Sequence, residues 1–335
     1  MNTIDGSDHY DKTSDEPPPS LLVIILDTNP HAWSLLSPVL SFSSAIANLL
    51  VFIDAHLAFN NANKVAIVAS HTQRAEFLYP PAEKKGQSGS RAGTNGVIAG
   101  GRDGRRDDGE DTEMGEANDD MEAQTPDDAN HYRPFRHIQA TLVAALTRLL
   151  RKTKPSDLTP STSIAGALSL ALTYINKTSL SLSTNPTTQP QSDTIMSNES
   201  TPPLHARLLL LSVSSPLAHH YIPITNTIFA AQRQKIPIDI LQLSGEPIFL
   251  QQASDATGGV YIKLSSPDQA RGLLQYLMMG FLPDQTSRKW LVLPTGGSVD
   301  FRAACFCHRK VVDVGFVCSI CLSSELPTFS YVRVG

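Results

Sequence analysis

Short aliphatic runs alternate along this chain with longer segments in which apolar residues recur at helical spacing. Aliphatic runs bounded by turn residues are typical of fully buried strands. They predict strands at residues 21–27, 64–70, 75–80, 207–213, 237–243 and 260–264. The helical spacing predicts helices at residues 41–59, 138–149, 161–176, 225–234, 246–256 and 267–280. This alternation indicates a doubly wound α/β sheet with helices on both faces.

One pair of predicted strands departs from the parallel pattern. Only a short polar gap separates residues 64–70 from residues 75–80. Such a gap predicts a hairpin, in which the two strands run antiparallel. We therefore expect a mostly parallel sheet with one antiparallel edge strand.

Two polar stretches interrupt the alternation of strands and helices. Residues 82–130 are rich in Gly, Asp and Glu, and residues 178–203 are rich in Ser, Thr, Asn, Gln and Pro. Neither stretch can bury enough apolar surface to order itself, so both are predicted to be disordered insertions. The predicted organisation is a disordered N-terminus (1–19), an α/β domain (20–282), a linker (283–300) and a C-terminal cysteine-rich segment (301–335).

The charge of the chain is concentrated in the first of these insertions. The formal net charge is −5, and residues 83–128 hold thirteen acids and six bases, which leaves a net of +2 for the rest. Proteins that bind nucleic acid without sequence preference need a basic surface. The near-neutral balance of the folded part argues against that class.

Several features of the sequence predict an intracellular protein without a membrane segment. The N-terminus is polar and acidic, where a secretory signal would be basic and then apolar. The longest aliphatic runs, such as residues 21–26, are too short to span a bilayer. All four cysteines lie within residues 305–321, unlike an extracellular disulfide framework.

The first strand delivers Asp27 to the carboxyl edge of the sheet, where open α/β sheets bind ligands. The sequence DTNPH (27–31) is similar to the D-x-S-x-S metal site of von Willebrand A domains, with Asn29 and His31 in place of the serines. Mg²⁺ needs hard oxygen ligands in an octahedron, and no aspartate follows strand 207–213. We expect a vestigial site at Asp27 and Asn29 that holds no Mg²⁺, with Asp27 accepting hydrogen bonds from local backbone amides.

The strongest chemical signal is the cluster CFCHRKVVDVGFVCSIC at residues 305–321. Cys318 and Cys321 have the C-x-x-C spacing of a zinc knuckle, and Cys305 and Cys307 can supply a second pair of thiolates. Tetrahedral sulfur ligation suits Zn²⁺. Two alternatives remain: unligated thiols in a short hydrophobic tail, or a redox pair, which would normally follow the start of a βαβ unit.

Motifs of common enzyme classes are absent from the sequence. It contains neither G-x-x-x-x-G-K-[ST] nor G-x-S-x-G, and the first strand is not followed by G-x-G-x-x-G. We therefore expect a protein that binds other molecules and catalyses no reaction.

Several longer segments of the sequence carry a family resemblance. They are LLVIILDTNP (21–30) with Trp33, FAAQRQKIPIDI (229–240), LQQASDATGGVYIKL (250–264), LLQYLMMGFLPD (273–284) and RAACFCHRKVVDVGFVCSICLS (302–323). In these segments the chain resembles the smaller von Willebrand A-domain subunit of the general transcription and DNA-repair factor TFIIH. The resemblance covers nearly all of the ordered part, and the two insertions lie outside it.

The resemblance implies a von Willebrand A-like α/β fold and a non-enzymatic structural role in the nucleus. It implies pairing with the larger A-domain subunit of TFIIH, in RNA polymerase II transcription initiation and nucleotide excision repair. It also implies a zinc module with further cysteines after the C-x-x-C, whereas this chain continues from Ser323 to Gly335 without another. Three alternatives follow: Cys305 and Cys307 complete the zinc site, the module binds no zinc, or the C-terminus is truncated or contains an unremoved intron.

The surface most suited to partner binding is expected to be apolar. A desolvated aromatic side chain commonly anchors an interface, which makes Trp33, Phe306 and Phe316 candidates, although each of them fits a core position equally well. Two rival functions are a Mg²⁺-dependent binder that uses Asp27 and a zinc-finger binder of nucleic acid. The few bases around the cysteines disfavour the second rival.

Overall fold

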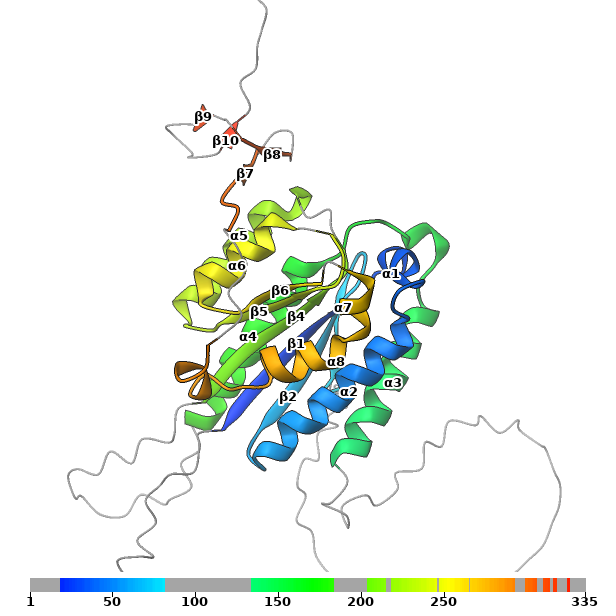
Figure 1. The fold of residues 1–335 in the computed structure, drawn as a ribbon, viewed down its shortest axis with the longest axis vertical. Helices are drawn as coiled ribbons and strands as arrows, with labels where there is room; N and C mark the ends of the chain where they lie inside the picture. Colours follow the sequence, from blue (N-terminus) through cyan, green and yellow to red (C-terminus); the bar gives the residue numbers. More distant parts are fainter. Residues whose placement is uncertain are drawn as a thin grey trace, which may run out of the picture.

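The computed structural model describes residues 19–81, 134–183, 204–214, 218–245, 247–264, 266–292, 299–305, 310–313, 316–317 and 324–325. The predicted N-terminal segment, the insertion 82–130 and most of the insertion 178–203 therefore lie outside the described residues. The described residues form a single α/β sheet covered by helices, followed by two short strand pairs in the C-terminal segment (Figure 1).

Six strands form the central sheet, in the order β3-β2-β1-β4-β5-β6 (Figure 1). Their bounds are β1 Ser20–Asp27, β2 Lys64–Ser70, β3 Ala75–Tyr79, β4 His205–Ser212, β5 Ile238–Gln242 and β6 Tyr261–Lys263. The edge strand β3 is antiparallel to β2, and the other neighbours pair in parallel. The mostly parallel sheet with one antiparallel edge strand is confirmed, and the ends of the six predicted strands are right to within two residues.

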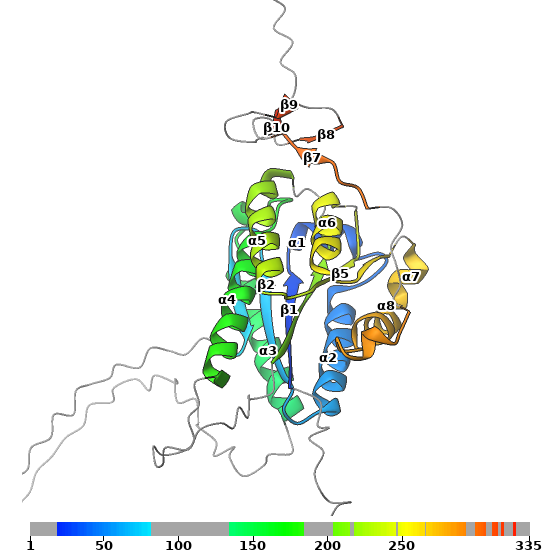
Figure 2. The ribbon, with the colours of Figure 1, turned by 90° about the vertical axis from the view of Figure 1, so that its left-hand side faces the viewer.

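Alternation along β1 divides the interior into two cores. Leu22, Ile24 and Leu26 face one core, whereas Leu21, Val23 and Ile25 face the other. The first core also contains buried side chains from α2, α3 and α8, and the second contains side chains from α4, α5 and α6. The view in Figure 2 places α2 and α8 on one side of the sheet and α4 and α5 on the other. The central strand is therefore apolar from Leu21 to Leu26, where both of its faces are covered.

The helices begin and end as follows: α1 Pro30–Leu36, α2 Phe42–Phe59, α3 Pro134–Arg151, α4 Ile164–Ser183, α5 Tyr221–Arg233, α6 Ile248–Thr257, α7 Pro267–Arg271 and α8 Leu273–Tyr276. Short turns are η3 Pro155–Asp157, η4 Ala218–His220, the π-helical turn η5 Leu277–Phe281, and η6 Ser287–Lys289. By length and composition α2 could span a membrane. Its buried side chains, among them Leu49, Phe52 and Ile53, instead pack in the first core.

Three helical features differ from the sequence prediction. Helix α1 was not predicted, although Asn29 caps it and Pro30 occupies its first turn, both of which favour a helix start. Helix α4 continues to Ser183, into the predicted insertion, and the hydroxyls of Thr178 and Ser181 are accommodated by donating to carbonyls of the same helix. The predicted helix 267–280 is broken at Gly272, whose ψ of 15° is not helical.

The residues predicted to be a linker, 283–300, contact the α/β domain along much of their described length. The turn η6 lies in this stretch, and the Gln252 side chain of α6 donates to the carbonyls of Asp300 and Arg302. Beyond it, β7 (Ala303–Ala304) pairs with β8 (Val311–Val312), and β9 (Phe316–Val317) pairs with β10 (Ser324–Glu325), all beyond the end of α5 and α6 in Figures 1 and 2. The chain therefore leaves the sheet by a path that polar contacts hold in place.

Candidate functional site

Asp27 lies at the end of β1 with its carboxylate enclosed by backbone amides. One oxygen, Oδ2, accepts from the backbone N–H of Val213 at 3.1 Å and of Ser214 at 2.8 Å, and Oδ1 accepts from Asn29 N–H at 3.1 Å. The side chain is fully buried. Burial raises the pKa of Asp27, and its hydrogen bonds to Ser214, Val213 and Asn29 act in the opposite direction. The carboxylate therefore joins the ends of β1 and β4.

Asn29 forms the second half of this arrangement. Its Oδ1 accepts from His31 N–H at 3.1 Å, which caps α1. Its Nδ2 lies within 3.0–3.4 Å of three successive carbonyls and of Ser214 Oγ. The three carbonyls belong to the loop before α4, at Thr159, Pro160 and Ser161. The Asn29 side chain thus ties that loop to the start of α1.

Trp33 belongs to the core, the second of the alternatives that the sequence left open. Its side chain is buried, and its Nε1–H donates to the carbonyl of Asp27 at 2.7 Å. The ring lies edge-on to Phe42 with centroids 4.9 Å apart. Trp33 therefore braces α1 against the end of β1 and presents little surface to a partner.

A second cluster of polar side chains lies beside Asp27, at the end of β2, and its members were not among the predicted site residues. The Thr28 hydroxyl donates to Ser70 O at 3.2 Å and lies 3.0 Å from His71 Nδ1. His71 Nε2 lies 2.9 Å from the Thr153 hydroxyl. Burial is the main cause that lowers the pKa of His71. Ser70 and His71 end a buried strand as Asp27 does, so the same argument from strand ends could have found them.

Thr162 completes the group at this edge. Its hydroxyl lies 2.8 Å from Ser70 Oγ and donates to Ser70 O at 3.2 Å. The side chains of Thr28, Ser70 and Thr162 are all buried. These hydroxyls therefore satisfy one another and the local backbone.

The side chains present do not fit a Mg²⁺ site of the D-x-S-x-S kind. Both oxygens of Asp27 already accept backbone N–H groups, and the Asn29 amide nitrogen points at carbonyls and at Ser214. His31, in place of the second serine, offers no oxygen in its side chain. A hydrogen-bonded junction between β1, β4 and the loop before α4 occupies the place of the metal.

Cys305 is the one cysteine among the described residues. It is 1% exposed, and its backbone N–H donates to Lys310 O at 2.8 Å, next to the β7–β8 pair. Cys307, Cys318, Cys321 and Phe306 lie outside the described residues, and of Phe316 only the strand backbone is described. The predicted zinc ligands therefore stay a prediction.

A family model described as transcription factor Tfb4 matches residues 19–327, which include the whole sheet and the cysteine cluster. The chain belongs to the Tfb4 family. This match confirms the family resemblance that was inferred from the segments around Asp27, Gly258 and the cysteines.

Curated Tfb4 relatives match over most of the chain. The general transcription and DNA repair factor IIH subunit tfb4 of Schizosaccharomyces pombe is 39% identical over 308 residues, or 91% of this chain and 84% of that protein. The subunit TFB4 of Saccharomyces cerevisiae is 35% identical over 323 residues, or 92% of this chain and 81% of that protein. These relatives are named as subunits of a transcription and repair factor, which agrees with the expectation of a non-enzymatic protein.

A solved structure matches this chain in both sequence and fold. The crystal structure of the TFIIH p34 N-terminal domain is 41% identical, with a TM-score of 0.57, and the match covers 79% of this chain and 98% of that one. A likeness in fold alone extends to the SpRpn10 VWA domain, at 12% identity and a TM-score of 0.40, over 76% of this chain and 93% of that one.

Proposed function

We propose that this chain is a structural subunit of the TFIIH core that pairs with the larger A-domain subunit of that factor. It would act in the nucleus, in RNA polymerase II transcription initiation and in nucleotide excision repair. The family match over residues 19–327 carries the proposal, since it includes both the α/β domain and the cysteine-rich segment. The relatives named as TFIIH subunits support membership in the same assembly.

The geometry at Asp27 supports binding through protein surface and not through a metal ion. An A domain that binds its ligand by way of Mg²⁺ must offer the ion a set of oxygen ligands in an octahedron. Here the three backbone N–H groups of Asn29, Val213 and Ser214 use both oxygens of Asp27. The rival function, a Mg²⁺-dependent binder, therefore requires this junction to open.

The first experiment is reconstitution with the larger A-domain subunit of TFIIH. Mixing the two purified chains in buffer with and without added Mg²⁺, followed by size-exclusion chromatography, should give the same stable complex in both. Failure to form a complex in either buffer would contradict the pairing. A complex that needs Mg²⁺ would favour the rival instead.

The second element of the proposal is a zinc site at Cys305, Cys307, Cys318 and Cys321. Paired thiolates are the ligands of structural Zn²⁺ sites. The purified full-length chain, alone and with its partner, should contain one zinc per chain by elemental analysis, and the Cys318→Ser variant should lose it. No zinc in either wild-type preparation would contradict this element while leaving the pairing untouched.

One observation speaks against the rival function of nucleic-acid binding. The Arg302 guanidinium, one of the few bases near the cysteines, pairs with Asp300 at 2.6 Å and with Asp313 at 2.8 Å. An arginine neutralised on both sides by carboxylates contributes little to phosphate binding. A steeply salt-dependent affinity for DNA that is lost on cysteine mutation would reverse this judgement.

A further inference from the structure

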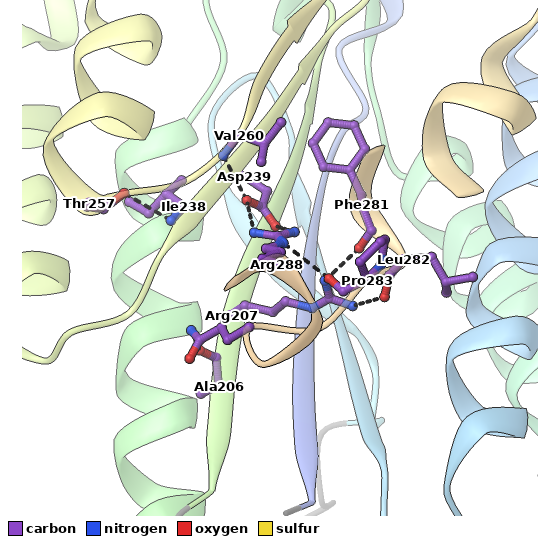
Figure 3. A network of polar contacts seen from close by, with 11 residues as sticks. Ala206, Arg207, Ile238, Asp239, Thr257, Val260, Phe281, Leu282, Pro283 and Arg288 are labelled. Atoms are coloured by element: carbon purple, nitrogen blue, oxygen red, sulfur yellow. Dashed lines mark hydrogen bonds and ion pairs between the residues drawn. The ribbon is translucent and has the colours of Figure 1, made fainter. Parts of the chain in front are cut away.

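A buried arginine in β4 binds the end of the last helix. Arg207 is 2% exposed, and its Nη1 donates to Phe281 O at 2.6 Å and to Pro283 O at 2.7 Å. Its Nη2 donates to Leu282 O at 3.1 Å. These are carbonyls at the C-terminal end of the α8–η5 helix, which have no partners within the helix and form the negative end of its dipole. Arg207 therefore fixes the point at which the chain leaves that helix (Figure 3).

A second arginine, beyond this point in the chain, reaches back to the sheet. Arg288 makes two charge-assisted hydrogen bonds to Asp239 of β5, at 2.8 Å and 2.6 Å, and its Nε donates to Pro283 O at 3.1 Å. The side chains of Arg288 and Asp239 are 7% and 1% exposed. Asp239 also accepts from the backbone N–H of Val260 at 2.9 Å. Figure 3 shows the Arg207 guanidinium directed at the carbonyls of residues 281–283 and the Arg288 guanidinium directed at Asp239, with the Pro283 carbonyl between them.

The shared carbonyl of Pro283 makes these contacts one network, defined here as the arginine network of Arg207, Asp239 and Arg288. It connects β4, β5 and the entry to β6 with residues 281–288. Buried charges cost much desolvation energy, and hydrogen bonds and ion pairs offset that cost. Arg207 and Arg288 have the partners named above only when the chain follows this path.

We propose that the arginine network is a conformational device that fixes the exit path of the chain and couples the C-terminal segment rigidly to the sheet. Gln252 supplies a second attachment farther along, at the carbonyls of Asp300 and Arg302. With both attachments in place, the described start of the cysteine-rich segment, residues 301–305, is held beside α6. The segment that the sequence predicts as a linker thus becomes the structural support of the C-terminal module. This inference stands apart from the proposed function and holds for the chain alone.

Hydrogen–deuterium exchange on the full-length chain tests the coupling. In η6 the backbone N–H groups of Arg288 and Trp290 donate to Asp284 O and Ser287 O, each at 3.0 Å, within a turn too short to persist without tertiary support. Wild-type protein should protect these amides. In Arg288→Gln, exchange there should be faster by about a hundredfold, because a buried partner is lost, while amides of β1 remain protected.

A matched control and a second variant separate the effect on the path of residues 281–288 from the effect on the stability of the whole chain. Arg302→Gln removes an arginine whose side chain is 46% exposed and paired at the surface, so it should leave exchange at η6 unchanged. The double variant Asp239→Asn/Arg288→Gln removes the buried ion pair but keeps the third buried charge, that of Arg207, on its carbonyl partners. It should recover part of the lost stability while exchange at η6 stays fast.

Two results would overturn the proposal. Exchange of the η6 amides at the unprotected rate in wild type would show that the exit path is not fixed. Loss of protection spread evenly over η6 and β1, in the single and the double variant alike, would show that the network contributes only to global stability.

Discussion

At the scale of single residues, the side chains at the predicted vestigial metal site form hydrogen bonds within the protein. Asp27 and Asn29 stand where a D-x-S-x-S site would place oxygen ligands, yet each of their polar atoms has a partner within the protein. A fully buried carboxylate is tolerated because three N–H groups replace its water.

Replacing Asp27 by Asn should therefore destabilise the chain. One carboxylate oxygen would become an NH₂ group that faces the N–H of Val213 and Ser214 or that of Asn29, so buried donors would lose their acceptor. We expect a loss of about 1–3 kcal/mol in the free energy of unfolding, measured by urea titration. Ser34→Ala, whose hydroxyl is in an exposed bond to His31 O, is the control. An unchanged midpoint for Asp27→Asn would mean that these bonds contribute nothing.

His56, on the buried face of α2, should make stability depend on pH. Burial, with a further contribution from the charge of Arg207, lowers the pKa of His56 from 6.5 to about 4. Between these values the folded protein binds fewer protons than the unfolded chain, so stability is lost as the pH falls through this window. The loss should approach about 3 kcal/mol at its acid end.

The His56→Gln variant isolates this contribution. Urea titrations between pH 7.5 and pH 4.5, values chosen to span roughly the titration range of histidine, should show a steeper loss in wild type than in the variant. His137→Gln, an exposed position on α3, is the matched control and should keep the wild-type slope. Parallel curves for wild type and His56→Gln would contradict a depressed pKa.

At the scale of elements, the turn between α6 and β6 contains two glycines that its geometry requires. Gly258 ends α6 in the left-handed region at φ +70°, and open space surrounds the position of its absent Cβ. At Gly259 an added Cβ would lie 2.0 Å from the carbonyl oxygen of Ile238 in β5. The first glycine supplies a backbone conformation, and the second lets two backbones approach each other.

These two glycines make a matched pair of variants. Gly258→Ala should cost about 1 kcal/mol, which is the strain of a left-handed residue with a side chain. Gly259→Ala should cost clearly more, on the order of 3 kcal/mol, because backbone atoms of β5 must move. Thermal or urea unfolding measures both, and equal effects of the two variants would contradict the close approach at Gly259.

The sequence predicts elements well where one physical cause dominates, and less well where several compete. The aliphatic runs at β1 and β4 are buried on both faces, so composition alone locates them. Helix α4 extends into a polar stretch, where the hydroxyls of Thr178 and Ser181 bond back to carbonyls of their own helix, which composition does not reveal. Of the three amides that donate to Asp27, that of Asn29 is local, as expected, but those of Val213 and Ser214 lie more than 180 residues away in the chain, and no spacing rule identifies them.

At the scale of the whole molecule, the exit path of the chain defines where the α/β domain ends. The sequence places the boundary at residue 282, after the last apolar helix. The structure shows the turn η6, from Ser287 to Lys289, held against β5 by the Arg288–Asp239 pair. The sequence signals for the arginine network were single charged residues, Arg207 and Asp239, beside aliphatic residues of the strands.

Two truncations should locate the boundary. A chain that ends at residue 292 keeps the arginine network, whereas a chain that ends at residue 282 lacks Arg288 and leaves Asp239 buried without its charged partner. The shorter chain should be less stable than the longer one by about 3–5 kcal/mol, which is the cost of breaking a buried ion pair. The longer chain should lose the packing of Ala304 and Cys305 and the Gln252 bonds to Asp300 and Arg302, but no buried ion pair, so its urea midpoint should lie closer to that of the full chain. Equal midpoints for the two truncations would place the boundary at 282 and make residues 283–292 a linker after all.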